Sequence, residues 1–186
     1  MRCFKKLDIM LSRLFCDIRK IKFKRSLIVG VIYFIIGAIV WFFGGNFQRI
    51  MLLFIFPKSA LPLFIMYILW GVSHFACGFI FGAFIFSCDK YRRQLIYRIC
   101  IALVLMQTFT FISYMLFFGA NAPFVAFLSF LATLFFCVVA ILFCFRNFYS
   151  CGFFLILHFL WLLYNAYITL AFSIINWKNI DKKELE

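Results

Sequence analysis

The chain of 186 residues has a hydrophobic content of 67% and a formal net charge of +13. A soluble domain is closer to half apolar, and a soluble chain this short could not bury so much apolar surface in one core. The composition therefore excludes an ordinary soluble domain and favours an integral membrane protein. The positive charges gather in the N-terminal tail and between long apolar runs. This distribution is typical of loops at an anionic membrane surface and argues against nucleic-acid binding.

Residues 1–25 are predicted to form a basic amphipathic segment on the membrane surface. Its apolar residues recur at helical spacing: Leu7, Leu11, Leu14, Ile18 and Ile21. Lysine and arginine fill much of the remaining surface. A helix with one apolar and one basic face lies in the interface and is attracted to anionic lipids. Anionic lipids are therefore the expected partner of this segment.

The next part of the chain, 26–177, is predicted to be one all-α domain of five transmembrane helices. About 20 helical residues cross the hydrocarbon core. Five apolar runs reach that length, at 26–45, 62–87, 95–118, 124–145 and 151–175. Residues 178–186 are expected to be a charged C-terminal tail.

One further apolar stretch, residues 50–56, is too short to span a membrane. It is expected to lie at the interface or to fold over the mouth of a pocket. Tight turns are expected at 119–123 and 146–150, where glycine, proline and polar residues separate the apolar runs.

The orientation follows from the basic residues. Fourteen of the 19 lysine and arginine residues fall in the N-terminal tail and in the two loops on the same side. The positive-inside rule places this side in the cytoplasm. Five spans then place the C-terminus on the opposite side.

Enzyme signatures are missing from the sequence. It contains no P-loop, G-x-G-x-x-G, G-x-S-x-G or H-E-x-x-H motif, and no Asp or Glu within the five runs. Ion-coupled transporters usually carry an intramembrane carboxylate, so an ion-driven pump is not expected. The eight cysteines form no C-x-x-C pair and are interpreted as small apolar packing residues. No catalytic residue, metal site or required cofactor is predicted.

Two of the runs carry aromatic and polar residues at helical spacing. Trp70, His74 and Gly78 stand four residues apart in the second run, and His158, Trp161 and Asn165 follow a similar spacing in the fifth. Two such faces can line an apolar pocket with a few polar anchors. They can equally serve as packing surfaces joined by hydrogen bonds between helices.

The same residues resemble a motif of the TspO/MBR family, the tryptophan-rich sensory and translocator proteins. That family has Pro, three residues, Pro-Pro, seven residues, Trp, three residues, Tyr, three residues and Gly. This chain has Pro57, Leu61-Pro62, Trp70, His74 and Gly78 at that spacing. In the fifth run, the matching offsets hold Gly152, Leu155, His158, Trp161, Asn165, Thr169 and Asn176. The third run ends in Phe117-Phe118-Gly119, similar to the family's Phe-Phe-Gly.

The resemblance covers roughly residues 30–177 and implies a five-helix receptor or translocator, expected to be a homodimer. Its ligand would be a flat hydrophobic molecule such as a porphyrin, haem or sterol, held in a cavity between helices. Trp70 and Trp161 would stack on the ligand. Pro57 and Pro62 would belong to a loop that closes the mouth, and Gly78 and Asn165 to the helices around it.

The chain also departs from the family pattern. Leu61 replaces one proline of the pair. When Phe-Phe-Gly is aligned, Met106 and Thr110 stand where the family has Gln and Asn, and Gln107 fits only with a shift of one residue. His74 and His158 stand where the family has Tyr. They could contact the ligand or ligate haem iron, or could replace Tyr as hydrogen-bonding rings between helices.

The alternative function is a subunit of a small-molecule transporter, such as the substrate-binding subunit of a vitamin importer. Those subunits usually have six spans. A purely structural membrane protein is a third reading, and it predicts no saturable ligand binding.

Overall fold

A computed structural model describes residues 22–43, 55–86 and 93–181, and these residues form helices and no strand. The helices are α2 (Phe23–Phe43), α4 (Leu63–Ile85), α5 (Arg93–Tyr114), α6 (Pro123–Asn147) and α7 (Tyr149–Asp181), with a π-helical segment, η2 (Met115–Gly119), directly after α5. Five helices in the described part are long and apolar enough to cross a membrane. The predicted amphipathic segment, except for its last residues, and most of the stretch 50–56 lie outside the described residues.

Two helix boundaries differ from those expected from hydropathy. Helix α2 begins at Phe23, before the apolar run, and Lys24 and Arg25 belong to its exposed first turn. Long basic side chains can extend from a helix end towards water, so the helix need not begin where the apolar residues begin. Helix α7 continues to Asp181 and so includes the first residues of the expected charged tail.

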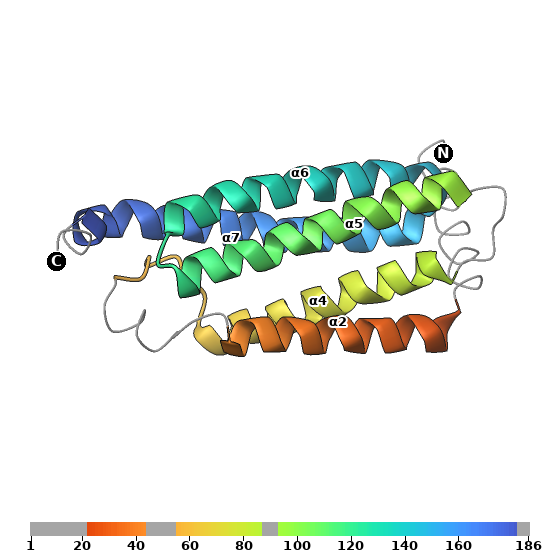
Figure 1. The fold of residues 1–186 in the computed structure, drawn as a ribbon, viewed down its shortest axis with the longest axis horizontal. Helices are drawn as coiled ribbons and strands as arrows, with labels where there is room; N and C mark the ends of the chain where they lie inside the picture. Colours follow the sequence, from red (N-terminus) through yellow and green to blue (C-terminus); the bar gives the residue numbers. More distant parts are fainter. Residues whose placement is uncertain (1–21, 44–54, 87–92, 182–186) are drawn as a thin grey trace, which may run out of the picture.

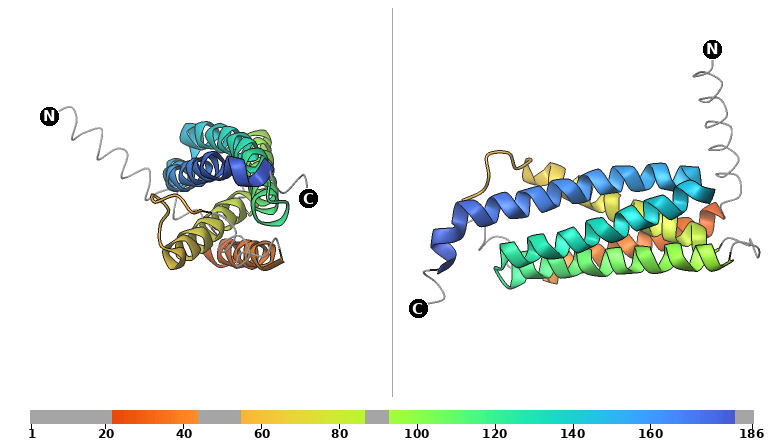
Figure 2. Two further views of the ribbon diagram at one scale, coloured as in Figure 1. Left: turned by 90° about the vertical axis from the view of Figure 1, so that its left-hand side faces the viewer. Right: turned by 90° about the horizontal axis from the view of Figure 1, so that it is seen from above.

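The helices form a ring in which neighbours along the chain run in opposite directions (Figure 1). Helix α2 packs mainly on α4, α4 also meets α5 and α7, and α6 packs on both α5 and α7. The end-on view of Figure 2 shows the ring closing between α5 and α2, where few residues touch. The α2–α5 seam is therefore the loosest in the ring.

Apolar side chains cover the outside of the bundle, as expected for a surface solvated by lipid. Phe64, Phe135 and Ile174 are each more than 60% exposed. Buried hydroxyl groups inside the bundle bond to carbonyls of their own helix, as Thr110 does to Met106 at 2.8 Å and Thr133 does to Ser129 at 3.1 Å. Such bonds satisfy polar groups where no bulk water is present.

A tight turn joins η2 to α6. The backbone N–H of Ala120 donates to the carbonyl of Met115 at 3.1 Å, a bond across five residues. Asn121 then adopts a positive φ of 52°, a conformation that asparagine tolerates better than most residues. Pro123 opens α6 at a position where its missing N–H costs nothing.

Residues 55–62 form an irregular segment that leads into α4 and contains a turn closed by the bond from the N–H of Ala60 to the Pro57 carbonyl. We call it the strap. It lies at the same end of the bundle as the η2–α6 turn and the C-terminal part of α7 (Figure 1).

Candidate ligand cavity between α4, α5, α6 and α7

A small cavity lies inside the bundle near the strap. Its volume is about 30 Å³, enough for about one water molecule. Its wall is mostly aromatic and aliphatic and is formed by Met66, Trp70, Tyr114, Phe117, Phe118, Phe130, Trp161, Asn165, Ile168 and Thr169. Four helices and η2 contribute to it.

The structure places Trp70 of α4 and Trp161 of α7 in the wall of this one cavity. Both are buried, at 5% and 9% exposure. Tyr114 of α5 lies beside them. Its ring centroid is 6.3 Å from that of Trp70, and its hydroxyl interacts with both indoles. The i, i+4 spacing in the sequence identified the two tryptophans, but it gave no sign of Tyr114.

Asn165 also lines the cavity, one turn beyond Trp161. Its side-chain nitrogen donates to the Trp161 carbonyl at 2.8 Å. Thr169, one turn further, donates to the Asn165 carbonyl at 3.0 Å. Both polar side chains are therefore held on their own helix, and they give a mainly apolar wall its polar edge.

Neither histidine belongs to the cavity wall. His74 lies behind Trp70, with ring centroids 4.4 Å apart. Its Nδ1 lies 3.1 Å from the Trp70 carbonyl. A carbonyl oxygen only accepts, so Nδ1 carries the proton and Nε2 carries a lone pair in the neutral ring. Nε2 of His74 has no hydrogen-bond partner in the structure.

His158 is tied to α4 instead. Its Nδ1 forms a hydrogen bond of 2.5 Å with the hydroxyl of Ser73. The histidine is 3% exposed. This bond links α7 to α4 inside the bundle, which is the packing role considered for it from the sequence. Ser73, its partner, was not singled out in the sequence, because a serine within an apolar run gives no distinctive signal.

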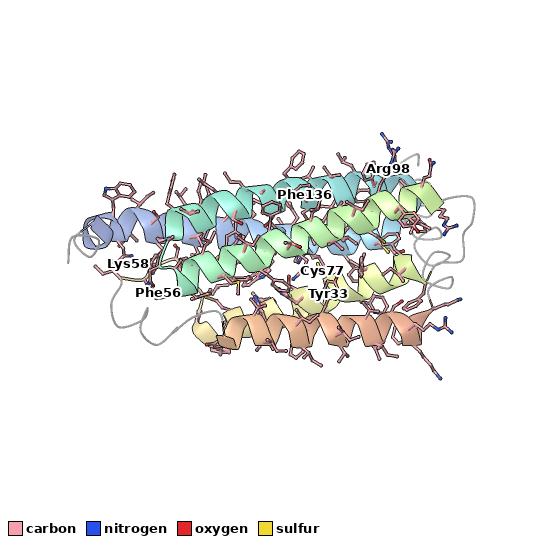
Figure 3. All side chains as sticks on the ribbon, viewed as in Figure 1. Tyr33, Phe56, Lys58, Cys77, Arg98 and Phe136 are labelled. Atoms are coloured by element: carbon pink, nitrogen blue, oxygen red, sulfur yellow. The ribbon has the colours of Figure 1, made fainter. Side chains whose placement is uncertain are left out.

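Gly78 faces α2 and is not part of the cavity wall. A Cβ added there would lie 2.5 Å from Cβ of Tyr33 on α2. Figure 3 shows Tyr33 and Cys77 near the middle of the bundle. Gly78 therefore permits close contact between α2 and α4 and does not line the cavity.

The predicted loop residues Pro57 and Pro62 belong to the strap. Pro57 is buried, whereas Pro62 is exposed and immediately precedes α4. Next to Pro57, the ring of Phe56 meets that of Phe172 on α7 at 5.5 Å, and Phe172 meets Phe117 of the cavity wall at 4.9 Å. The strap thus packs on the residues behind the cavity wall.

Hydrogen bonds fasten the strap to α7. The side-chain amide of Asn176 accepts from the N–H of Ile55 at 2.8 Å and donates to its carbonyl at 2.9 Å. Further along the strap, the N–H of Leu61 donates to the hydroxyl of Tyr164 at 2.7 Å. Tyr164 in turn stacks on Trp161, with ring centroids 5.6 Å apart. These bonds connect the strap directly to the cavity wall.

Metal ligands do not cluster in the described ranges: no group of three or more His, Cys, Asp or Glu side chains could hold an ion there. The described cysteines are free thiols.

An all-helical bundle of five helices, each long and apolar enough to cross a membrane, has the features of a multi-pass membrane protein. No protein-family model matches the chain, and no curated protein matches it significantly.

Proposed function

We propose that this protein is a TspO-like membrane receptor or translocator that binds a flat hydrophobic ligand, such as a porphyrin, haem or sterol, between its helices. One observation carries the proposal: Trp70 and Trp161, from two different helices, line one cavity with an otherwise mainly apolar wall. Indole faces stack well on flat conjugated molecules. Asn165 and Thr169 supply the few polar contacts that fix a ligand's orientation.

The size of the cavity defines how binding must occur. Ligand pockets usually measure roughly 300–1,000 Å³, whereas this cavity measures about 30 Å³. A porphyrin therefore requires the aromatic wall to move. The strap packs on residues directly behind that wall, since Phe56 meets Phe172 and Leu61 bonds to Tyr164. We expect the ligand to bind a state in which the strap has separated from α7, so its affinity includes the free energy of that opening.

Quenching of tryptophan fluorescence by protoporphyrin IX tests this proposal. The chain has four tryptophans. Trp70→Phe and Trp161→Phe should each remove a resolvable share of the quenching. Each should weaken binding about fivefold, since an aromatic contact contributes about 1 kcal/mol beyond buried area. Trp177→Phe is the matched control, because Trp177 is 57% exposed and lies outside this cavity.

Two results would contradict the proposal. One is quenching that follows Trp177, and the other is the lack of any saturable binding, which would leave a purely structural role. Haem is the second probe. Because neither histidine lines the cavity, haem and protoporphyrin should bind with similar affinity, whereas a strong preference for haem would assign iron ligation to His74 or His158.

The distribution of charge supports a cytoplasmic N-terminus. The end of the bundle where α2 begins holds Lys24, Arg25, Arg93, Arg98 and Arg146. The strap end holds Lys58, and α7 carries Lys178 near the same end. Figure 3 shows Arg98 and Lys58 at opposite ends. Reporter fusions at Asn121 and at the C-terminus should both be external. An internal C-terminal reporter would contradict this topology.

The proposed partners also follow from the sequence. We expect the basic segment 1–25 to associate with anionic lipids, and two copies of the chain to form a homodimer as the resemblance implies. Sedimentation in detergent with matched density measures the second expectation, and a monomer at all concentrations would refute it.

A further inference from the structure

A groove separate from the cavity runs along the seam between α2 and α5. Its volume is about 180 Å³, and it is lined by Tyr33, Ile36, Val104, Gln107, Thr108 and Phe111. Val104 and Thr108 are exposed on the outside of the bundle, so the groove opens towards the surrounding lipid. It coincides with the place where neighbouring helices touch least.

Gln107 supplies a buried polar side chain to this groove. It is 4% exposed, and neither its amide oxygen nor its amide nitrogen has a hydrogen-bond partner among the residues that the structure describes. Its neighbour Thr108 differs, because its hydroxyl donates to the Val104 carbonyl at 2.9 Å. An unpartnered amide in an apolar environment destabilises the folded state, and lipid offers no water to satisfy it. Gln107 therefore leaves two N–H donors and one acceptor oxygen in need of a partner.

A wall of stacked rings divides the groove from the cavity. Phe111, which lines the groove, stacks on His74 with centroids 5.6 Å apart and planes at 25°. His74 in turn packs on Trp70, which lines the cavity. The two spaces are therefore distinct sites, and a molecule in the groove need not affect the cavity.

We propose that the groove binds the hydroxyl-bearing end of a neutral single-chain alcohol from the lipid phase, with Gln107 as the recognition residue. A hydroxyl group both donates and accepts, so it can donate to Oε1 of Gln107 and accept from Nε2. Among the neutral head groups of single-chain lipids, an alcohol can engage both atoms through one oxygen.

The position and size of the groove restrict the ligand further. Gln107 lies near the middle of the span Arg93–Gly119, where an ionised head group is costly, and no charged side chain lines the groove. A volume of about 180 Å³ holds roughly six water-sized groups. It fits the end of one alkyl chain and excludes a porphyrin, so this ligand differs from the one proposed for the cavity.

The test is ligand-dependent thermal stability of the full chain, purified in lauryldimethylamine oxide, a detergent without hydroxyl groups. A ligand that binds only the folded state raises Tm in a saturable way. The probe is 1-tetradecanol, compared with tetradecane, tetradecanoate at neutral pH and dioleoylglycerol. We expect 1-tetradecanol to act at a concentration at least tenfold lower than any of the other three. Equal potency of tetradecane, or stabilisation by dioleoylglycerol alone, would overturn the proposal.

Variants then connect the effect to the amide. Gln107→Leu should reduce the potency of 1-tetradecanol at least tenfold, to that of tetradecane. Gln94→Leu, the same change at an exposed position on α5, should not alter it. Gln107→Leu replaces an unpartnered amide by an apolar group of similar size, so its Tm without ligand should equal or exceed that of the natural chain. Unchanged potency in Gln107→Leu would overturn the assignment.

A second copy of the chain is the competing occupant of the groove. It predicts a Tm that rises with protein concentration, a dimer weakened by Gln107→Leu and no effect of 1-tetradecanol; that result would overturn the proposal. Protoporphyrin quenching in Gln107→Leu is measured in parallel. Because the cavity lies behind the His74–Trp70 stack, we expect the quenching to be unchanged. The groove proposal and the cavity proposal can therefore be refuted independently.

Discussion

Helix α4 presents two unlike faces to the rest of the molecule. Towards α2 it presents Gly71, Gly78 and Gly82, and an added Cβ at any of them would lie within 3.0 Å of an atom of α2. Towards α5 and α7 it presents Trp70, Ser73 and His74, which are large or polar and buried. Trp70 and His74 also lie against Gly37 of α2. The glycine face brings two backbones into direct contact, whereas the aromatic face leaves a cavity.

This difference shows how one helix serves two purposes in a membrane. Without a hydrophobic driving force between helices, association depends on close packing and on hydrogen bonds inside the bundle. The glycine face supplies the packing for α2, and the Ser73–His158 bond supplies a polar link to α7. Substitutions on the glycine face should therefore affect stability, whereas substitutions on the aromatic face should also affect the ligand.

The largest loss of stability is expected from a substitution at Gly78. In Gly78→Val, Cβ would meet Cβ of Tyr33 and the carbonyl oxygen of Val29, 2.5 and 2.9 Å away, neither of which can rotate aside. Overpacking of this kind costs about 3 kcal/mol. The measurement is the unfolding midpoint in detergent.

Gly152→Val is the matched control for that experiment. Its added Cβ would lie 3.3 Å from the ring of Phe145, which has more freedom to adjust. If Gly78→Val unfolded at the same temperature as the natural chain, the contact between α2 and α4 described above would be wrong.

A smaller loss of stability is expected from Ser73→Ala on the aromatic face of α4. The change leaves Nδ1 of His158 without its partner, and an unsatisfied buried polar group costs about 2 kcal/mol. Thr108→Val is the comparison, because the Thr108 hydroxyl bonds only to its own helix and is exposed. A double-mutant cycle of Ser73→Ala with His158→Phe should show coupling between the two positions. Additive effects would mean that the bond contributes no link between α4 and α7.

The smallest loss of stability is expected from a substitution that removes a hydrogen bond of the strap. Tyr164→Phe removes the acceptor for the N–H of Leu61, at a cost of about 1 kcal/mol. The strap should then separate from α7 more often, so amide hydrogen exchange at residues 59–61 should accelerate about fivefold. Tyr167→Phe, which removes the exposed bond to Ser59, should have less effect. Equal exchange in both variants would show that Tyr164 does not hold the strap.

The sequence was sufficient to predict the helices and not their neighbours. Apolar runs of about 20 residues predicted all five helices, because that length is set by the membrane. Spacing placed His74 on the same face as Trp70, and their rings are in contact. Spacing also placed Gly78 on that stripe, but the structure turns it towards α2. Periodicity defines a face of a helix and does not say which helix covers it.

The attachments of the strap were harder to foresee. Asn176 was noted only as one of several matching offsets, yet it binds both backbone groups of Ile55 across 121 positions of sequence. Contacts of such long range depend on how the ends of the bundle come together, and no local pattern encodes that. Tyr114 was missed for the same reason, since it meets the two tryptophans only after α4, α5 and α7 assemble.

The π-helical segment Met115–Gly119 has a consequence for how this chain is compared with others. A π turn takes up one more residue than an α turn without lengthening the connection it makes. Residues before it, such as Gln107, and residues after its start, such as Phe118, are therefore out of step by one position relative to an uninterrupted α-helix. This extra residue does not account for the displaced match of Gln107, because alignment on Phe117-Phe118-Gly119 would need one residue more, not one fewer, between Gln107 and Phe117. A chain lacking one residue at the exposed position of Met115 could keep both groups in place, so a single gap inside this span is physically reasonable.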